Sequence, residues 1–408
     1  MVRRVPPRAR GDRRRPRAGG GHGRGRRRRA PPRGDPDDEG RRAVSEPRFR
    51  PTLVEVDLDR IRHNVRALAP PGAELMAVVK ADAYGHGEVP VARAALDAGA
   101  TWLGVALVEE GLRLRLAGIE APILVLSEAP EGSEAVLLAH RLTPSLYTRP
   151  GLERLAAAAR GAVAVHVKID TGMHRVGLWP PEAAPAFFHE VRRAGLEVEG
   201  VWTHLAKSED DEVTTKMQLD RLAGVVESAR AAGFEPRYVH AANSGGLLRH
   251  AEAHLDLVRP GIAIYGIPPA PGVGEGFELR PALSWRSRVA HAKRLPAGER
   301  ISYGLHHELE RPSWIATIPV GYADGYPRSS TGEVLIRGGR RRVAGTVTMD
   351  QLIVDCGDSE VTAGDEVVLL GRQNEEEVSA WELAASAGTV AYEIVSRIGA
   401  RVPREYRG

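Results

Sequence analysis

Between residues 75 and 261 the chain repeats one pattern of apolar and polar positions. Short apolar runs alternate with Ala-, Leu- and Arg-rich stretches that are typical of helices. The predicted strands are 75–80, 101–106, 123–126, 142–147, 163–170, 198–206, 238–243 and 254–261. The predicted helices between them include 88–98, 108–117, 150–160, 181–194 and 214–232. Repeated strand–helix units over this length predict an α/β fold, a closed (β/α)8 TIM-type barrel rather than an open sheet.

Polar residues stand where these predicted strands end. A barrel places its working groups at the carboxyl ends of its strands, and strands covered on both faces read as apolar runs. The residues at those ends are Lys80, Asp170, His204, Asn243 and Arg259. They are therefore the first candidates for a functional site.

The pattern changes near Arg286, where short strands begin to alternate with Gly, Pro and Asp turns. This rhythm predicts a mostly antiparallel β domain. Two helices are expected in it, at Glu376–Ala387 and Val390–Ile398, and the early run 52–58 predicts a strand that joins either domain. The predicted parts are an N-terminal extension (1–48), a barrel (49–285) and a β domain (286–408).

Charge separates the N-terminal extension from the rest of the chain. Residues 1–48 hold 17 Arg and 6 acidic residues, a net +11, whereas the other 360 residues hold 40 Lys and Arg against 47 Asp and Glu, a net −7. With few apolar residues to bury, the extension is expected to be disordered. It is either a polyanion-binding arm or, as we favour, an upstream extension of the reading frame. The acidic remainder argues against a nucleic-acid-binding domain.

A single cysteine, Cys356, excludes an internal disulfide framework and a zinc site built from several thiolates. A zinc site would need more ligands at ordered spacing than the sequence offers, so no metal is expected. We find no apolar signal-peptide core and no run long enough to span a membrane. These features predict a cytoplasmic protein without a membrane contact.

The stretch VVKADAYGHG (78–87) contains the clearest chemical candidate, Lys80. A lysine at a strand end usually keeps its ammonium group in water. Here glycines that permit close backbone approach and the hydroxyl of Tyr84 follow at once. A desolvated lysine has a lowered pKa and forms Schiff bases with carbonyls. In amino-acid metabolism the commonest such partner is pyridoxal 5′-phosphate (PLP).

Two small-residue turns offer a place for the phosphate of such a cofactor. HAANSGG (240–246) supplies Ser244, and VRPGIAIYG (258–266) supplies the amides of Gly261 and Ile262. Either turn alone is a weak signal. Together, at the ends of the last two barrel strands, they match the usual phosphate position of the fold.

Arg175 and His204 are weaker candidates from the pattern alone. An arginine in a loop is more often a surface residue, and a lone histidine on a strand is more often a core residue. Both alternatives remain open at this point.

Nine segments taken together resemble the alanine racemase family, a fold-type III group of PLP enzymes. They are AVVKADAYGHG, HVKIDTGMHRVG, THLAKSED, HAANSGG, VRPGIAIYG, ISYG, GYADGYPR, TVTMDQ and AYEIV. They occur in order between about Pro51 and Arg404 and leave out only the Arg-rich extension. The set is specific, although no single segment is.

The resemblance implies the roles of the cofactor-binding residues. Lys80 holds PLP covalently and is one acid/base, while Tyr303 is the other and reaches across from the second subunit of a homodimer. Arg259 faces the pyridine nitrogen, with His204 linking it towards Tyr303 and Asn243 beside it. The residues around the phosphate are Tyr84, Ser244, Gly261, Ile262 and Tyr392.

The resemblance also implies how the substrate is held. Arg175 contacts the phenolic oxygen of the cofactor and lies near the substrate carboxylate, and the backbone amide of Met349 from the partner subunit binds that carboxylate. Lys168 matches a position that is carbamylated in many relatives, where it positions the arginine equivalent to Arg175.

These roles agree with the chemistry of a racemase. Inverting an α-carbon needs a base on each face, here Lys80 and Tyr303. Tyrosine has a reference pKa of about 10 and needs cationic neighbours, which His204 and Arg259 supply. An arginine keeps its proton, so it leaves the pyridine nitrogen unprotonated. That weakens the cofactor as an electron sink and disfavours transamination.

Two segments depart from the family pattern. LHHELE follows SYG, where relatives usually have a Thr-containing segment, and GTVT precedes Met349, where many relatives place an arginine near the substrate entrance. Arg328 is retained. The departures concern the entrance and leave the predicted catalytic pair unchanged.

The expected function is alanine racemisation, which supplies D-alanine for peptidoglycan. The alternatives are a racemase of lysine, serine, ornithine or several amino acids, a PLP carrier built on the barrel alone, and nucleic-acid binding through residues 1–48. Broad-range relatives are often exported, and this chain shows no signal peptide. A carrier would need no second base, so Tyr303 and Met349 argue against it.

Overall fold

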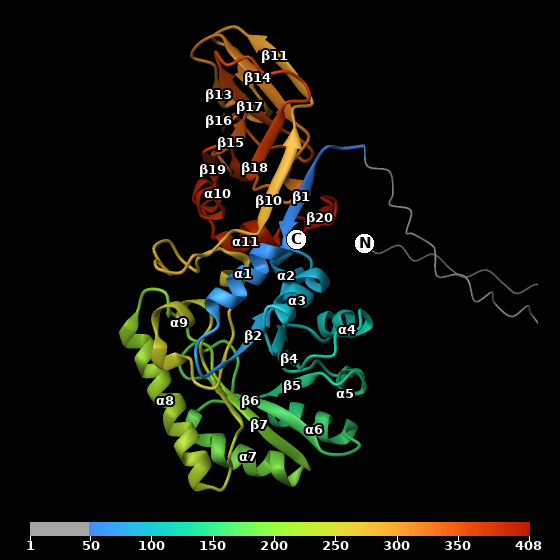
Figure 1. Cartoon of the computed structure of the whole chain (residues 1–408), viewed down its shortest axis with the longest axis vertical. Coiled ribbons are helices and arrows are strands. Elements are labelled where there is room, and N and C mark those ends of the chain that lie inside the picture. The colour runs from blue at the N-terminus through green and yellow to red at the C-terminus, as the bar shows by residue number, and fades with distance from the viewer. Residues whose placement is uncertain (1–48) are drawn as a thin grey trace, which may run out of the picture. The chain divides into compact units, whose positions relative to one another are not determined.

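The computed structural model describes residues 49–408. The predictions for residues 1–48, disorder and a polyanion-binding arm among them, lie outside the described residues. Within 49–408, eight parallel strands and their helices stand beside a large, mostly antiparallel sheet (Figure 1). The predicted fold class is therefore confirmed.

Each barrel strand pairs with the strand that follows it in sequence, except that the eighth strand pairs with the first and forms no ladder with the seventh. They are β2 (Glu74–Val78), β3 (Trp102–Val105), β4 (Ile123–Val125), β5 (Thr143–Leu146), β6 (Val163–Lys168), β7 (Leu196–Trp202), β8 (Tyr238–His240) and β9 (Leu257–Val258). Two backbone bonds join the β8 and β9 segments: Asp256 donates to Val239 at 3.1 Å, and Arg259 donates to Ala242 at 2.9 Å. These bonds complete the ring where no strand ladder does.

Several of the helices begin at side chains that accept backbone N–H groups. Asp211 caps the longest helix by accepting from Thr214 at 2.8 Å, and Thr148 caps another by accepting from Gly151 at 3.0 Å. Apolar residues on one face of each helix pack on the strands. The helices are α1 (Leu58–Leu68), α3 (Glu88–Asp97), α4 (Val108–Leu116), α5 (Glu134–Ala139), α6 (Arg149–Ala158), α7 (Ala184–Arg193), α8 (Glu212–Ala231) and α9 (Ser244–Arg249).

The expectation that Lys80 ends a strand is wrong. Strand β2 ends at Val78, and Lys80 begins the short element α2 (Lys80–Gly85). From Ala81 to Tyr84 the backbone is left-handed, with φ of 52–53°. A distant contact sets this conformation: the Glu110 carboxylate accepts the N–H of Ala81 at 2.7 Å.

The C-terminal sheet has the order β11-β14-β17-β16-β15-β18-β10-β1-β20. Its strands are β10 (Leu283–Arg288), β11 (His291–Leu295), β14 (Ser313–Ile318), β15 (Glu333–Ile336), β16 (Gly339–Val343), β17 (Leu352–Gly357), β18 (Glu366–Gln373), β20 (Arg404–Arg407) and, from the start of the chain, β1 (Leu53–Asp57). β1 pairs antiparallel with β10 and parallel with β20. The early predicted strand therefore belongs to the C-terminal sheet.

The helix predicted over Glu376–Ala387 is correct only in part. Its first residues form strand β19 (Glu376–Val378), which pairs with β18, and helix α10 (Ala380–Ala387) begins after Ser379. Ser379 accepts the N–H of Glu382 at 3.1 Å, so a capping residue marks the true start. The final helix, α11 (Ala391–Ser396), lies within the predicted range.

Within residues 49–408, no helix combines the length and the apolar character that crossing a membrane requires.

Candidate active site

The predicted barrel residues, except Asp170, gather around one cavity of about 680 Å³ at the carboxyl ends of the strands, while Asp170 accepts the N–H groups of Gly172 and His174. Its lining includes Lys80, Tyr84, Lys168, Arg175, His204, Asn243, Ser244, Arg259, Gly261, Ile262 and, from α11, Tyr392. Residues far apart in the sequence are thus brought together, as the order of the strands requires.

Lys80 lies half-buried in this cavity. Burial lowers the pKa of its amine, and the charge of Arg175 lowers it further, while Glu110 opposes the shift. A lysine with a lowered pKa is a better nucleophile and base near neutral pH. The position and electrostatics of Lys80 therefore suit covalent catalysis.

A hydroxyl and two amides meet in the wall of the same cavity. Ser244 Oγ accepts from the N–H of Gly261 at 3.0 Å and of Ala263 at 3.3 Å. A Cβ added at Gly261 would lie 2.5 Å from the Tyr84 hydroxyl, so glycine is needed for this close approach. Burial raises the pKa of Tyr84 and of Tyr392, which keeps both hydroxyls protonated as hydrogen-bond donors.

Gly261→Ala is expected to weaken PLP binding by about tenfold or more, since the added methyl group must displace Tyr84 at a cost of about 1–3 kcal/mol. The measurement is titration of the purified protein with PLP, followed by absorbance. Gly224→Ala is the matched control, because no heavy atom lies within 4 Å of its added Cβ. An unchanged affinity in Gly261→Ala would contradict the placement of the cradle.

Arg259 is buried and bonds only to neutral acceptors. Its guanidinium donates to His240 Nδ1 at 2.8 Å and to the carbonyls of Thr203 at 2.7 Å and Ala241 at 2.9 Å. Burial lowers its pKa to about 9. The partner histidine is thus His240, which the sequence analysis missed because a histidine inside a strand reads as a core residue.

His204 lines the same cavity, but its ring is not among the hydrogen-bond partners of Arg259. Burial, followed by the charge of Arg259, holds the pKa of His204 well below its usual value, so the imidazole is neutral at neutral pH. The role of His204 as a link towards Tyr303 stays a prediction.

Lys168 and Arg175 occupy β6 and the loop that follows it. Lys168 Nζ donates to the Val176 carbonyl at 2.7 Å, and its pKa is lowered to about 8 by burial and by the charges of Arg175 and Arg259. Arg175 forms no ion pair with another described residue. Its guanidinium therefore remains available to an anion in the cavity.

Tyr303 and Met349 line a different cavity, of about 660 Å³, in the C-terminal domain. They are 73% and 53% exposed, and none of the barrel residues of the first cavity lines this one. Tyr303 begins η4 (Tyr303–Leu305), between strands β12 (Arg300–Ile301) and β13 (His307–Glu308). Figure 1 shows β13 at the end of the sheet remote from the barrel.

Thr346 is hydrogen-bonded to the loop that carries Tyr303. Its hydroxyl donates to the Tyr303 carbonyl at 3.0 Å, and Ser302 Oγ donates to the Thr346 carbonyl at 2.5 Å. This pair of bonds holds Ser302 at a φ of 64°.

Thr346→Val is expected to lower kcat about three- to tenfold, because one hydrogen bond of about 1 kcal/mol that orients Tyr303 is lost. Thr346→Ser keeps the hydroxyl and serves as the control. Steady-state racemisation rates decide the matter, and equal rates in both variants would show that the bond does not position Tyr303.

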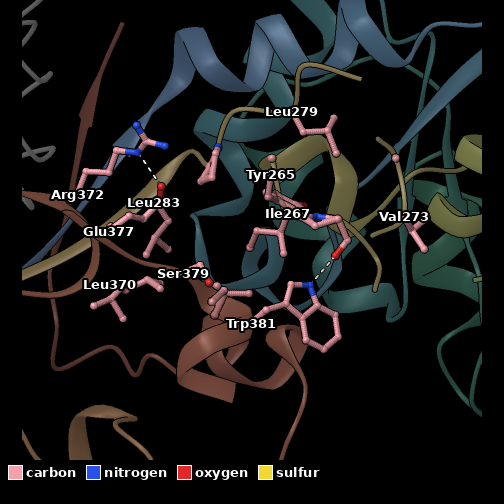
Figure 2. A pocket seen from close by; sticks show the side chains of 18 of the residues that line it. Tyr265, Ile267, Val273, Leu279, Leu283, Leu370, Arg372, Glu377, Ser379 and Trp381 are labelled. Carbon is pink, nitrogen blue, oxygen red and sulfur yellow. Dashed lines mark hydrogen bonds and ion pairs between the residues drawn. The ribbon is translucent and has the colours of Figure 1, made fainter. Parts of the chain in front are cut away.

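A third cavity, of about 450 Å³, lies where the segment after β9 meets β18, β19 and α10 (Figure 2). Its labelled side chains are mostly apolar. Its polar groups are paired, Trp381 with the Pro268 carbonyl at 2.9 Å and Arg372 with Glu377 at 2.7 Å. None of the predicted site residues lines it. The catalytic candidates therefore lie elsewhere.

Comparison with known proteins agrees with this geometry. The model of the alanine racemase N-terminal domain matches residues 56–269, and that of the C-terminal domain matches residues 282–406. An alanine racemase of Symbiobacterium thermophilum is 51% identical over 374 residues, covering 88% of this chain and 98% of the relative. One of Frankia casuarinae is 47% identical, covering 86% and 95%.

Solved structures show the same fold. Alanine racemase from D-cycloserine-producing Streptomyces lavendulae superposes with a TM-score of 0.84 at 42% identity, covering 89% of this chain and 98% of that one. The Bacillus anthracis enzyme with bound L-Ala-P gives a TM-score of 0.83 at 38% identity, covering 89% and 96%. With both family domains matched in order along residues 56–406, the chain belongs to the alanine racemase family.

Proposed function

We propose that this protein interconverts L-alanine and D-alanine with PLP, and so supplies D-alanine for peptidoglycan. One observation carries the proposal: a single cavity is lined both by a lysine of lowered pKa and by the Ser244–Gly261 cradle. The family is PLP-dependent, and the close approach of Tyr84 to Gly261 supports a phosphate site there.

The residues present fit the cofactor. Ser244, Gly261 and Ile262 would hold its phosphate, with the hydroxyls of Tyr84 and Tyr392 beside them. The amine of Lys80 would hold its aldehyde carbon. When bound, PLP supplies an electron sink for the α-carbon of the substrate.

The proposed mechanism uses two bases of this chain. Lys80 holds or releases a proton on one face of the α-carbon, and Tyr303 does so on the other. Arg175, which lacks an ion-pair partner among the described residues, and the backbone amide of Met349 orient the substrate carboxylate. Arg259 would face the pyridine nitrogen and, because an arginine keeps its proton, would leave that nitrogen unprotonated, which disfavours transamination.

We further propose that two copies of the chain complete each site. Lys80 and Tyr303 line separate cavities, and Tyr303 is largely exposed. A second copy that docks its C-terminal domain over the barrel mouth would bring Tyr303 and Met349 to the partner's Lys80. The exposed tyrosine then gains the cationic surroundings that catalysis requires of it.

Lys168 is proposed to react with CO₂. Its neutral amine attacks the carbon of CO₂, a C–N bond forms as one C=O π bond opens onto oxygen, and the nitrogen loses one proton to water, which leaves a carbamate. Because the pKa is about 8, the reactive neutral fraction rises as pH increases through that value. We expect carbon NMR with isotope-labelled bicarbonate to show one carbamate signal that Lys168→Arg removes and Lys216→Arg retains. A signal that survives Lys168→Arg would contradict the assignment.

The substrate is tested by α-proton exchange in deuterated water, with single L-amino acids and PLP. Exchange and D-product with alanine far above the rest would support the proposal. A preference for lysine, serine or ornithine would keep the two bases and change the substrate. No exchange with any of them would overturn the proposed function.

A further inference from the structure

A chain of buried polar side chains crosses the barrel interior below Arg259. Arg259 Nη1 lies 2.8 Å from His240 Nδ1, and His240 Nε2 lies 2.9 Å from His166 Nδ1. His166 Nε2 in turn faces Glu199 Oε2 at 3.5 Å. Both histidines are fully buried, whereas the Glu199 side chain is 21% exposed. The chain therefore joins the cofactor end of the barrel to a carboxylate in contact with solvent.

Hydrogen-bond chemistry gives this chain one direction. An arginine only donates, so His240 Nδ1 accepts and its proton resides on Nε2. That proton is donated to His166 Nδ1, so the proton of His166 also resides on Nε2. This N–H has no partner at standard hydrogen-bond geometry among the described residues, and Glu199 is the carboxylate that faces it. Only the Nε2–H tautomer of both rings satisfies every contact.

Charge supports the same assignment. Burial and the charge of Arg259 lower the pKa of both His166 and His240, so both rings are neutral at neutral pH. The pKa of Glu199 is lowered, chiefly by its interaction with His166. Arg259 has no carboxylate among its hydrogen-bond partners, so the negative end of the chain is Glu199.

The surrounding backbone is shaped around this chain. Between β6 and β7 the register pairs Val165 with Val198 but His166 with Gly200, which makes Glu199 the extra residue of a bulge. Bulges re-aim side chains. A Cβ added at Gly200 would lie 2.5 Å from His166 Nδ1, so a glycine leaves room for that ring.

An aromatic ring fixes the other histidine. Trp202 stacks on His240 with ring centroids 5.6 Å apart and an angle of 5° between the planes. Each imidazole therefore lies against a residue outside the hydrogen-bonded row, His166 against Gly200 and His240 against Trp202.

We propose that Glu199 is a remote positioning residue for Arg259, acting through His166 and His240 locked as Nε2–H tautomers. The inference rests on the proposed function in that Arg259 faces the cofactor. This row of side chains does not conduct protons. Passing a proton along it would require Arg259 to release one, and an arginine keeps its proton. Instead, each hydrogen bond in the row keeps the same donor and the same acceptor, and this holds the Arg259 guanidinium in one orientation.

The test is nitrogen NMR of the full-length protein labelled in its histidines, recorded with and without PLP. Signals are assigned by their loss in His166→Gln and His240→Gln. We expect both rings to be neutral and protonated on Nε2 in both states. Because this readout needs neither cofactor nor turnover, its failure is distinct from a failure of the proposed function. A proton on Nδ1 of either ring would overturn the proposal.

Variants at Glu199 probe its role. Glu199→Ala removes the carboxylate that faces His166 Nε2–H, so we expect the Nε2 signal of His166 to shift and, in the PLP-loaded enzyme, kcat to fall about tenfold with KM changed less than twofold. Glu199→Gln, whose amide oxygen still accepts from His166, should restore both. Glu197→Ala, on the exposed side of the same strand, is the control and should change neither. An unshifted His166 Nε2 signal together with an unchanged kcat in Glu199→Ala would overturn the positioning role. If that variant fails to fold, the tautomers in the spectrum of the unaltered protein decide.

Discussion

Lys80→Ala is expected to abolish racemisation, with a loss of about a thousandfold or more, together with the absorbance of covalently held PLP. The amine is both the proposed attachment point of the cofactor and one of the two bases, and acid–base catalysis alone contributes about 10²–10⁴-fold. Its side chain makes no hydrogen bond to another described residue, so alanine leaves no buried partner unsatisfied.

The measurement combines the absorbance spectrum of the purified variant with its racemisation rate. Lys216→Ala, at an exposed lysine of α8 that pairs with Asp220 at 3.0 Å, is the matched control and should behave as the unaltered protein. A normal spectrum of bound cofactor in Lys80→Ala would remove Lys80 from its proposed role.

Tyr303→Phe is expected to retain PLP and to lose about 10²–10⁴-fold of the racemisation rate in both directions. Only the hydroxyl is removed, and the residue is 73% exposed in the single chain, so the fold should tolerate the change. The cofactor should remain bound because its proposed ligands line the other cavity. Full activity in Tyr303→Phe would eliminate the two-base mechanism.

Mixing the two variants tests whether sites are shared. A heterodimer of Lys80→Ala with Tyr303→Phe contains one site with both bases intact, provided that Tyr303 acts on the partner's Lys80. Activity should then reappear only in the mixture. Verified heterodimers that remain as inactive as each parent would show that the two bases belong to the same chain.

The barrel was predictable because its strands are covered on both faces and read as apolar runs. Their ends were not, since an apolar run does not mark where a ladder stops: the run 163–170 continues beyond β6, which ends at Lys168. Helix propensity misplaced Glu376–Val378, because pairing with β18 outweighs it. In each case a contact distant in sequence overrode the local signal.

The candidate site, too, could be predicted only where the local sequence carried the signal. Lys80, Ser244 and Gly261 stood in segments whose composition indicated chemistry, and the structure brings them to one cavity. The turn that carries Lys80 depends on Glu110, from a different helix, and could not be inferred locally. His240 was overlooked because its importance arises only from its bond to Arg259.

Strand β1 has a consequence for how the molecule is made. It lies between β10 and β20, so the entire barrel is inserted between neighbouring strands of one sheet. During synthesis β1 precedes the whole barrel, yet both of its neighbours follow it: β10 comes directly after the barrel, and β20, which contains Arg404, comes after the other strands of the sheet. Domains that are complete in sequence fold as they emerge. We therefore expect the barrel to fold before β1 gains either neighbour, with Tyr392 the one proposed cofactor residue still to be added, and the sheet to close once β20 has emerged.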